Sequence, residues 1–143
     1  MDVNFIREIL INYRGPRRAK PVIRNATHAA DFIRRVLPDN AREHFVTLYL
    51  DAGHKIAAFS VTATGTADSC PVHAREVFQC AVLIGATAII VGHNHPSGES
   101  GPSDCDRMVT SKLREVGTLL GIKVLDHVVL GEDRMYSFAE HGE

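Results

Sequence analysis

Residues Ala86 to His95 read ATAIIVGHNH, and the rest of the chain is arranged around them. The run from Ala86 to Val91 is short, uncharged and rich in β-branched residues, which predicts a buried β-strand. His93 and His95 follow two positions apart, and strand side chains two positions apart point to the same face. The two imidazoles can therefore grip one metal ion at the end of this strand.

A loop and then a helix follow the histidines, and the helix offers a carboxylate. The loop contains residues that turn the chain back: Pro96, Ser97, Gly98, Gly101 and Pro102. Ser103 and Asp106 come next, three positions apart and so on one side of the first helical turn. Asp106 can complete a site with three protein ligands and a fourth position for water, as in catalytic zinc sites. For this pair alone, a helix capping box is the simpler explanation.

The combined motif resembles the signature of the RadC-like family, which belongs to the JAB/MPN (JAMM) metalloprotease superfamily. The superfamily pattern is a distant Glu, then His-x-His, seven residues and Ser-x-x-Asp, and Pro96 to Pro102 provides the seven residues here. The resemblance runs from about Ala41 to Phe138, and its further motifs are Arg42-Glu43-His44-Phe45, His73-x-Arg75-Glu76-Val77-Phe78 and Asp126-His127. It implies a single-domain α/β protein with the MPN (JAB) fold, which is cytidine-deaminase-like and has a mixed β-sheet flanked by helices.

The resemblance also implies a role for each residue of the site. His93, His95 and Asp106 would bind Zn²⁺, with a water as the fourth ligand. Glu43 would be the general base that activates this water, and Ser103 would donate a hydrogen bond to the developing oxyanion. Loss of such a donor costs about 2.7–4 kcal/mol in an enzyme that uses one. No residues that bind an organic cofactor are predicted.

Other polar residues are weaker candidates for the site. Glu76 is expected in a helix beside Arg75 and reads as structural, and Glu99 lies in a loop, which positions a base poorly. Asp126 and His127 match the family, but Asp-His pairs are common at strand edges, so neither receives a role.

The expected function is a zinc-dependent hydrolase of peptide or isopeptide bonds, with a peptide or protein as substrate. The alternative is an accessory protein of DNA repair or recombination with little or no hydrolase activity. Its local support is a basic segment with four cations, Arg14, Arg17, Arg18 and Lys20, so nucleic-acid binding stays a weak alternative. A homodimer stays open. A nucleotide deaminase is disfavoured because its His-x-Glu and Pro-Cys-x-x-Cys signature is missing from the sequence.

Composition sets broad limits on the chain. Its 143 residues are 45% hydrophobic with a formal net charge of −1, which predicts one globular domain and disfavours a general nucleic-acid binder. No apolar run is long enough to span a membrane, and the first ten residues lack a signal-peptide core. Three cysteines without paired spacing predict free thiols in a reducing compartment, hence a cytoplasmic protein.

The chain divides into an N-terminal helix with a basic arm, residues 1–25, and the RadC-like MPN/JAB domain, residues 26–143. The N-terminal helix is expected over residues 4–13. Thr27 is expected to cap the first helix of the domain, which ends near Leu37. The remaining elements are expected to be a hairpin (44–51 and 55–64), a helix (72–84), the strand from Ala86, a helix from Asp104 to 120, and strands 122–130 and 135–138.

Overall fold

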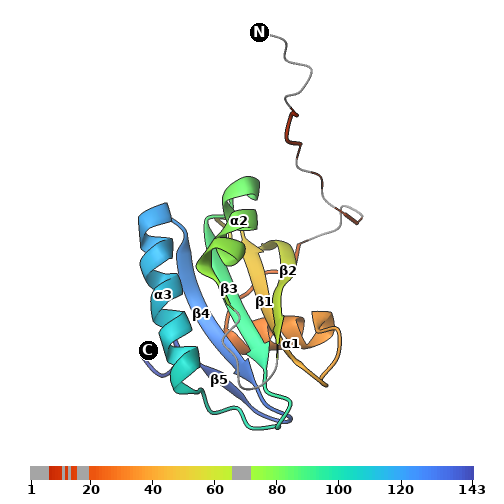
Figure 1. Ribbon diagram of the computed structural model, residues 1–143, viewed down its shortest axis with the longest axis vertical. Coiled ribbons are helices and arrows are strands. Elements are labelled where there is room, and N and C mark those ends of the chain that lie inside the picture. The colour runs from red at the N-terminus through yellow and green to blue at the C-terminus, as the bar shows by residue number, and fades with distance from the viewer. Residues whose placement is uncertain (1–6, 11, 13, 16–19, 66–71) are drawn as a thin grey trace.

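The computed structural model describes residues 7–10, 12, 14–15, 20–65 and 72–143. Its helices and strands follow one another in the order αββαβαββ (Figure 1). They are α1 (Ala26–Val36), β1 (Glu43–Leu50), β2 (Ile56–Gly65), α2 (Ala74–Ile84), β3 (Ala88–Asn94), α3 (Asp104–Leu120), β4 (Lys123–Leu130) and β5 (Met135–Ser137).

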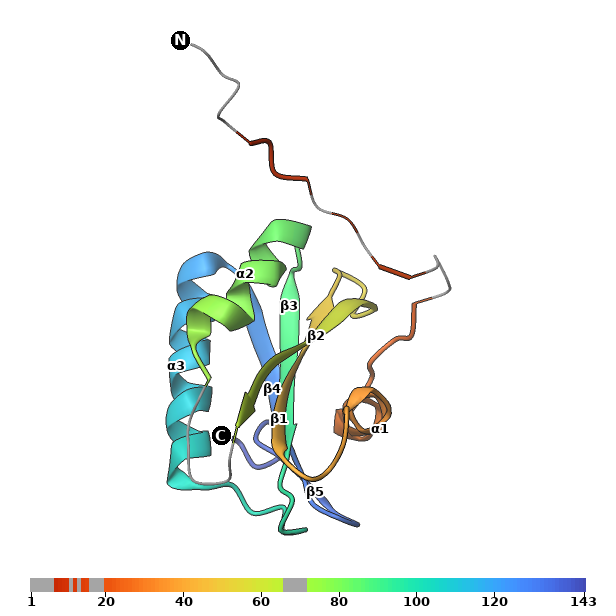
Figure 2. The same ribbon diagram turned by 45° about the vertical axis from the view of Figure 1, so that its right-hand side comes forward.

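The five strands form one mixed sheet in the order β2-β1-β3-β4-β5. Neighbouring strands are antiparallel except for β3 and β4, which are parallel. Parallel neighbours need a crossover connection, and α3 supplies it. Helix α1 covers one face of the sheet, while α2 and α3 cover the other (Figure 2). The expected α/β fold with a mixed sheet flanked by helices is confirmed.

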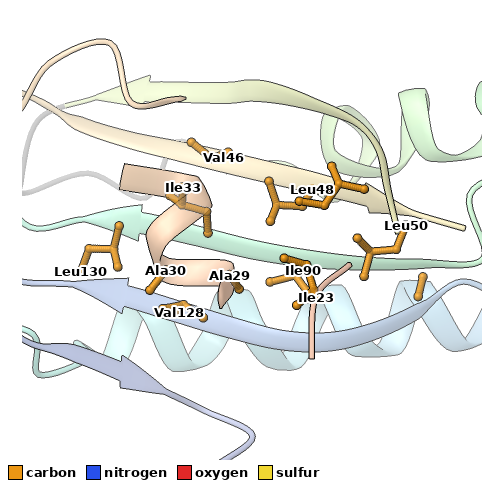
Figure 3. Close-up of a cluster of buried hydrophobic side chains, with 12 residues drawn as sticks. Ile23, Ala29, Ala30, Ile33, Val46, Leu48, Leu50, Ile90, Val128 and Leu130 are labelled. Carbon is orange, nitrogen blue, oxygen red and sulfur yellow. The ribbon is translucent and has the colours of Figure 1, made fainter. Parts of the chain in front are cut away.

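Each face of the sheet carries its own hydrophobic core. In the core under α1, Ala29, Ala30 and Ile33 face apolar side chains of β1, β3 and β4 (Figure 3). The opposite core joins α2 and α3 to the sheet, and Phe45 and Tyr49 belong to it. Strand β1 therefore contributes to both cores, as its nearly continuous apolar sequence predicts.

Gly92 lets α1 lie close to the central strand β3. A Cβ atom at this position would lie only 2.5 Å from Cδ1 of Ile33 and 3.0 Å from the carbonyl oxygen of Val128. The missing side chain thus gives Ile33 its place in the core. The glycine that precedes the first histidine is a packing requirement of the fold.

Most expected element boundaries move by only one or two residues, and two differences matter. Asn25, not Thr27, caps α1, because its side-chain oxygen accepts a hydrogen bond from the N–H of His28 at 2.9 Å. Asn is the stronger capping residue of the two. Strand β3 also continues past Val91 to Asn94, because His93 still pairs with Phe45 of β1 and Val129 of β4.

The N-terminal expectations lie partly outside the described residues. Half of the helix expected over residues 4–13 lies there, and the other half, residues 7–10 and 12, is described and not helical. Of the basic segment, Arg17 and Arg18 also lie outside the described residues. Within the described part of the chain, no helix combines the length and apolar character that crossing a membrane requires.

The cysteines differ from the expectation of free thiols. Cys80 of α2 is free, whereas Cys105 of α3 is disulfide-bonded, and Cys70 lies outside the described residues. Sequence spacing does not predict the state of Cys105, because disulfide pairing depends on which cysteines the folded chain brings into bonding geometry.

Candidate metal centre

Three segments meet where β3 ends, and each brings part of the expected site. Glu43 begins β1, His93 and His95 lie at the end of β3 and just beyond it, and Asp106 lies in the first turn of α3. One ligand atom from each of these four residues lies within 4.8 Å of the other three. The fold therefore brings together four residues that are up to 63 positions apart in the sequence.

The spacing of the ligand atoms suits a small tetrahedral ion. Nε2 of His93 lies 3.0 Å from Nε2 of His95 and 3.2 Å from Oδ1 of Asp106. Nε2 of His95 lies 3.3 Å from Oδ2 of Asp106. Two ligands at normal zinc distances in a tetrahedron are about 3.4 Å apart. The residues thus fit a divalent ion, and donors of this kind also accept other divalent metals.

The carboxylate of Glu43 lies slightly farther from His93 than the other candidate ligand atoms do. Its Oε1 atom lies 3.8 Å from Nε2 of His93, and its side chain is 19% exposed. Burial raises the pKa of Glu43 and the negative charge of Asp106 adds to this, although His93 and His95 oppose it. A carboxylate with a raised pKa beside a metal site is well suited to accept a proton and return it.

Asp106 is at once a helix cap and a candidate ligand. Its Oδ2 atom accepts a hydrogen bond from the N–H of Ser103 at 2.8 Å, and Oγ of Ser103 accepts one from the N–H of Asp106 at 3.0 Å. The capping box and the metal-ligand reading are therefore both compatible with this geometry. Burial alone would raise the pKa of Asp106, but hydrogen bonds with His93 and His95 hold it well below the usual range.

His95 is oriented by the loop that follows it. Its Nδ1 atom lies 2.9 Å from the carbonyl oxygen of Glu99. A carbonyl only accepts, so Nδ1 carries a proton and Nε2 turns toward Asp106. The hydrogen bond with Asp106 raises the pKa of His95, and burial partly opposes this shift. Glu99 thus contributes its main chain, while its side chain and that of Glu76 are exposed.

His127 and Thr110 stand behind His93, although the sequence analysis gave them no role. Nε2 of His127 lies 2.8 Å from Nδ1 of His93, and Nδ1 of His127 lies 2.6 Å from Oγ1 of Thr110. Burial lowers the pKa of His127 well below its ordinary value. The sequence favours a strand edge for His127, but β4 lies inside the sheet, as the apolar run Val128–Leu130 after it indicates.

Asp126 has a different task from its neighbour His127. Its Oδ2 atom accepts a hydrogen bond from Oγ of Ser137 at 2.6 Å, and Oδ1 accepts one from the N–H of Ala139 at 3.0 Å. These bonds join β4 to β5 and to the turn that follows it. Asp126 therefore fastens the edge of the sheet and does not reach the metal centre.

Asn94, the residue between the two histidines, holds the segment that carries Glu43. Its Nδ2 atom donates hydrogen bonds to the carbonyl oxygen of Arg42 at 2.9 Å and to Oδ1 of Asn40 at 2.8 Å. Its Oδ1 atom accepts one from the N–H of His44. One buried amide thus grips the main chain on both sides of Glu43.

Comparison with known proteins agrees with this geometry. The sequence profile of the RadC-like JAB domain matches residues 23–143. A UPF0758 protein of Chlorobaculum parvum is 35% identical over 141 residues, which cover 99% of this chain and 64% of that protein. UPF0758 proteins of Xanthomonas euvesicatoria pv. vesicatoria and Trichlorobacter lovleyi are 49% identical over 102 residues and 45% identical over 112 residues. Those matches cover 71% and 78% of this chain.

The chain spans only part of these relatives, since the three matches cover 64%, 45% and 49% of their lengths. The matched family agrees with the MPN (JAB) fold that the sequence predicts and with the five-stranded mixed sheet.

Proposed function

The chain belongs to the RadC-like JAB domain family, and from this premise we propose that it is a zinc-dependent hydrolase of peptide or isopeptide bonds. One observation carries the proposal. Ligand atoms of His93, His95 and Asp106 converge at nearly tetrahedral spacing, with the half-buried carboxylate of Glu43 beside them. A partly buried base next to a metal site is the arrangement that hydrolysis of an amide requires.

Each residue of the centre has a task in this proposal. His93, His95 and Asp106 would hold the ion. When bound, the ion would supply a nucleophilic water at neutral pH and polarise the carbonyl group of the substrate. Glu43 would take a proton from the attacking water and return it to the leaving amine. Its raised pKa suits the first of these steps, because a stronger base accepts a proton more readily.

Ser103 is proposed to donate a hydrogen bond to the carbonyl oxygen as negative charge develops there. Its oxygen accepts the N–H of Asp106, which leaves the hydroxyl proton for another acceptor. The side chain is exposed beside the ligand Asp106, so a bound substrate can reach it. Such a donor acts mainly in the transition state.

Metal analysis followed by hydrolysis assays tests the proposal. We expect elemental analysis to find about one zinc ion per chain, and to find it lost in His95→Ala and Asp106→Asn. Glu43→Gln should keep the zinc but lower hydrolysis of a peptide and isopeptide library by about 100-fold or more. Glu99→Gln is the matched control, since that carboxylate is exposed in the loop after His95, and it should leave hydrolysis unchanged.

The alternative role in DNA repair predicts different results. A zinc-loaded protein that cleaves no library member, and that binds DNA with an affinity that falls steeply with salt, would contradict the hydrolase proposal. A wild-type protein that takes up no metal at all would contradict it directly.

A further inference from the structure

A directed chain of hydrogen bonds runs behind the metal centre, and its first acceptor is the main-chain carbonyl of Asp106. Oγ1 of Thr110 lies 2.7 Å from this carbonyl oxygen. A carbonyl cannot donate, so the hydroxyl of Thr110 must donate its only proton here. The direction of the first bond is therefore set by chemistry alone.

The direction of the first bond fixes the donor and the acceptor in the next two hydrogen bonds, Thr110–His127 and His127–His93. Because the hydroxyl proton of Thr110 is already used, its oxygen must accept from Nδ1 of His127, 2.6 Å away. A neutral imidazole carries one N–H, so Nε2 of His127 is then an acceptor. Nδ1 of His93 lies 2.8 Å from this Nε2 atom and must be its donor.

We propose that Thr110 and His127 are positioning residues that keep a proton on Nδ1 of His93 and thereby assign its Nε2 atom to the metal ion. The inference rests on the proposed function, because it concerns the same metal centre. Nε2 is the nitrogen that faces His95 and Asp106. Any proton that it carries in the metal-free protein is the one that an ion displaces. A hydrogen bond to the second ring nitrogen also makes a histidine a better ligand.

Packing shields these hydrogen bonds from water and keeps the histidine rings from rotating. His127 is completely buried, and Thr110 is 2% exposed. The ring of Phe138 stacks on His127 with 4.9 Å between centroids and 8° between planes, and Phe45 packs edge-on at 5.5 Å. A competing water would have to displace one of these rings. Asp106 supplies both the carboxylate and the carbonyl that starts the chain, so one helical turn orients two ligands.

Nitrogen NMR of the wild-type, metal-free protein tests the direction of the chain without any substitution. Histidine ring nitrogens with and without a proton have different ¹⁵N shifts. We expect His127 to be protonated at Nδ1 and unprotonated at Nε2, and His93 to keep its Nδ1 proton before and after zinc is added. A His127 that carries its proton on Nε2 would overturn the inference.

Zinc affinity, measured by competition with a chelator, tests whether this series of hydrogen bonds supports metal binding. Thr110→Val removes the hydroxyl at nearly constant volume, and we expect it to weaken zinc binding by about 10–100-fold. Thr110→Ser restores the hydroxyl and should stay within a few-fold of wild type. Thr47→Val is the matched control, because Thr47 is equally buried and bonded to Thr62 at 2.7 Å within the sheet.

The outcomes separate this inference from the proposed function. Wild-type affinity in Thr110→Val, or an equal loss in Thr47→Val, would overturn the positioning role. If the wild-type protein binds no zinc, the proposed function fails, while the NMR shifts of His127 still decide the direction of the chain. If Thr110→Val does not fold, the wild-type spectrum still tests the direction of the hydrogen bonds.

Discussion

The side-chain oxygen of Asn94 accepts a hydrogen bond from the main-chain N–H of His44 at 2.8 Å. The amide nitrogen of Asn94 donates to the carbonyl oxygen of Arg42 on the other side of Glu43. Because Asn94 lies between the two histidines, one short segment both carries two candidate metal ligands and fixes the strand that carries Glu43. The hydrogen bonds from Asn94 to the main chain of Arg42 and His44 therefore fix the position of Glu43 relative to the two histidines.

Replacing Asn94 should destabilise the protein. Asn94→Ala leaves the N–H of His44 and the carbonyl of Arg42 without this partner, and a buried polar group left unsatisfied costs about 1–3 kcal/mol. Urea unfolding of the metal-free protein measures the loss. Asn40→Ala is the control, since it removes only one of the bonds of Asn94, and it should cost less than Asn94→Ala. Equal losses in the two variants would contradict the role of Asn94.

A side chain at Gly131 should disturb the loop that orients His95. A Cβ atom there would lie 2.5 Å from the carbonyl oxygen of Gly98 and 3.0 Å from the nitrogen of Ser100. Both atoms belong to the main chain, so the loop itself must move, and Glu99 within it holds Nδ1 of His95. We expect Gly131→Ala to lower stability by about 1–3 kcal/mol and to weaken zinc binding.

Chelator competition and urea unfolding measure the two effects of Gly131→Ala. Gly53→Ala provides the comparison, because its Cβ atom would make only an ordinary contact of 3.5 Å with Asp51. That variant should bind zinc like the wild type. Unchanged zinc binding in Gly131→Ala would show that the loop does not orient His95.

Zinc binding should weaken as the pH falls. A ligand must lose its proton before it binds the ion, and the hydrogen bond with Asp106 raises the pKa of His95. A raised pKa means that the proton is held at a higher pH than in a free histidine. We therefore expect the apparent affinity to decline already above about pH 6.5, in competition titrations between about pH 8 and pH 6. An affinity that stays constant over this range would contradict the assignment of His95.

Bound zinc should stabilise the folded chain by mass action. Free zinc at about 100 times its dissociation constant should raise the free energy of unfolding by about 2.7 kcal/mol. The gain should disappear with a chelator and in Asp106→Asn. Asparagine is the sharper substitution, because its side-chain oxygen can still accept the N–H of Ser103 and keep the cap. Urea unfolding with and without zinc checks this, and an equal gain in Asp106→Asn would exclude Asp106 as a ligand.

Local features of the chain were predictable because they depend on short spacings. The alternation of a strand places His93 and His95 on one side, and a single helical turn joins Ser103 to Asp106. The family resemblance added Glu43, which no local pattern connects to the histidines. The predicted cap of α1 was wrong, because Asn25 two positions earlier caps the helix in place of Thr27. The predicted free thiol of Cys105 was wrong, because the pairing of a cysteine depends on residues distant in the sequence.

The residue pattern alone predicted the order of the elements, the burial of the central strand and the candidate ligands of the proposed metal centre. The tertiary structure alone decided which residues support that centre. Thr110 is 17 positions from His127, His127 is 34 from His93, and Asn94 is 50 from His44. A hydrogen bond requires a distance near 3 Å and a defined direction between two side chains or a side chain and a main-chain group. The periodic pattern of side chains along a helix or strand does not predict such contacts, since only the packing of strands and helices brings the partners together.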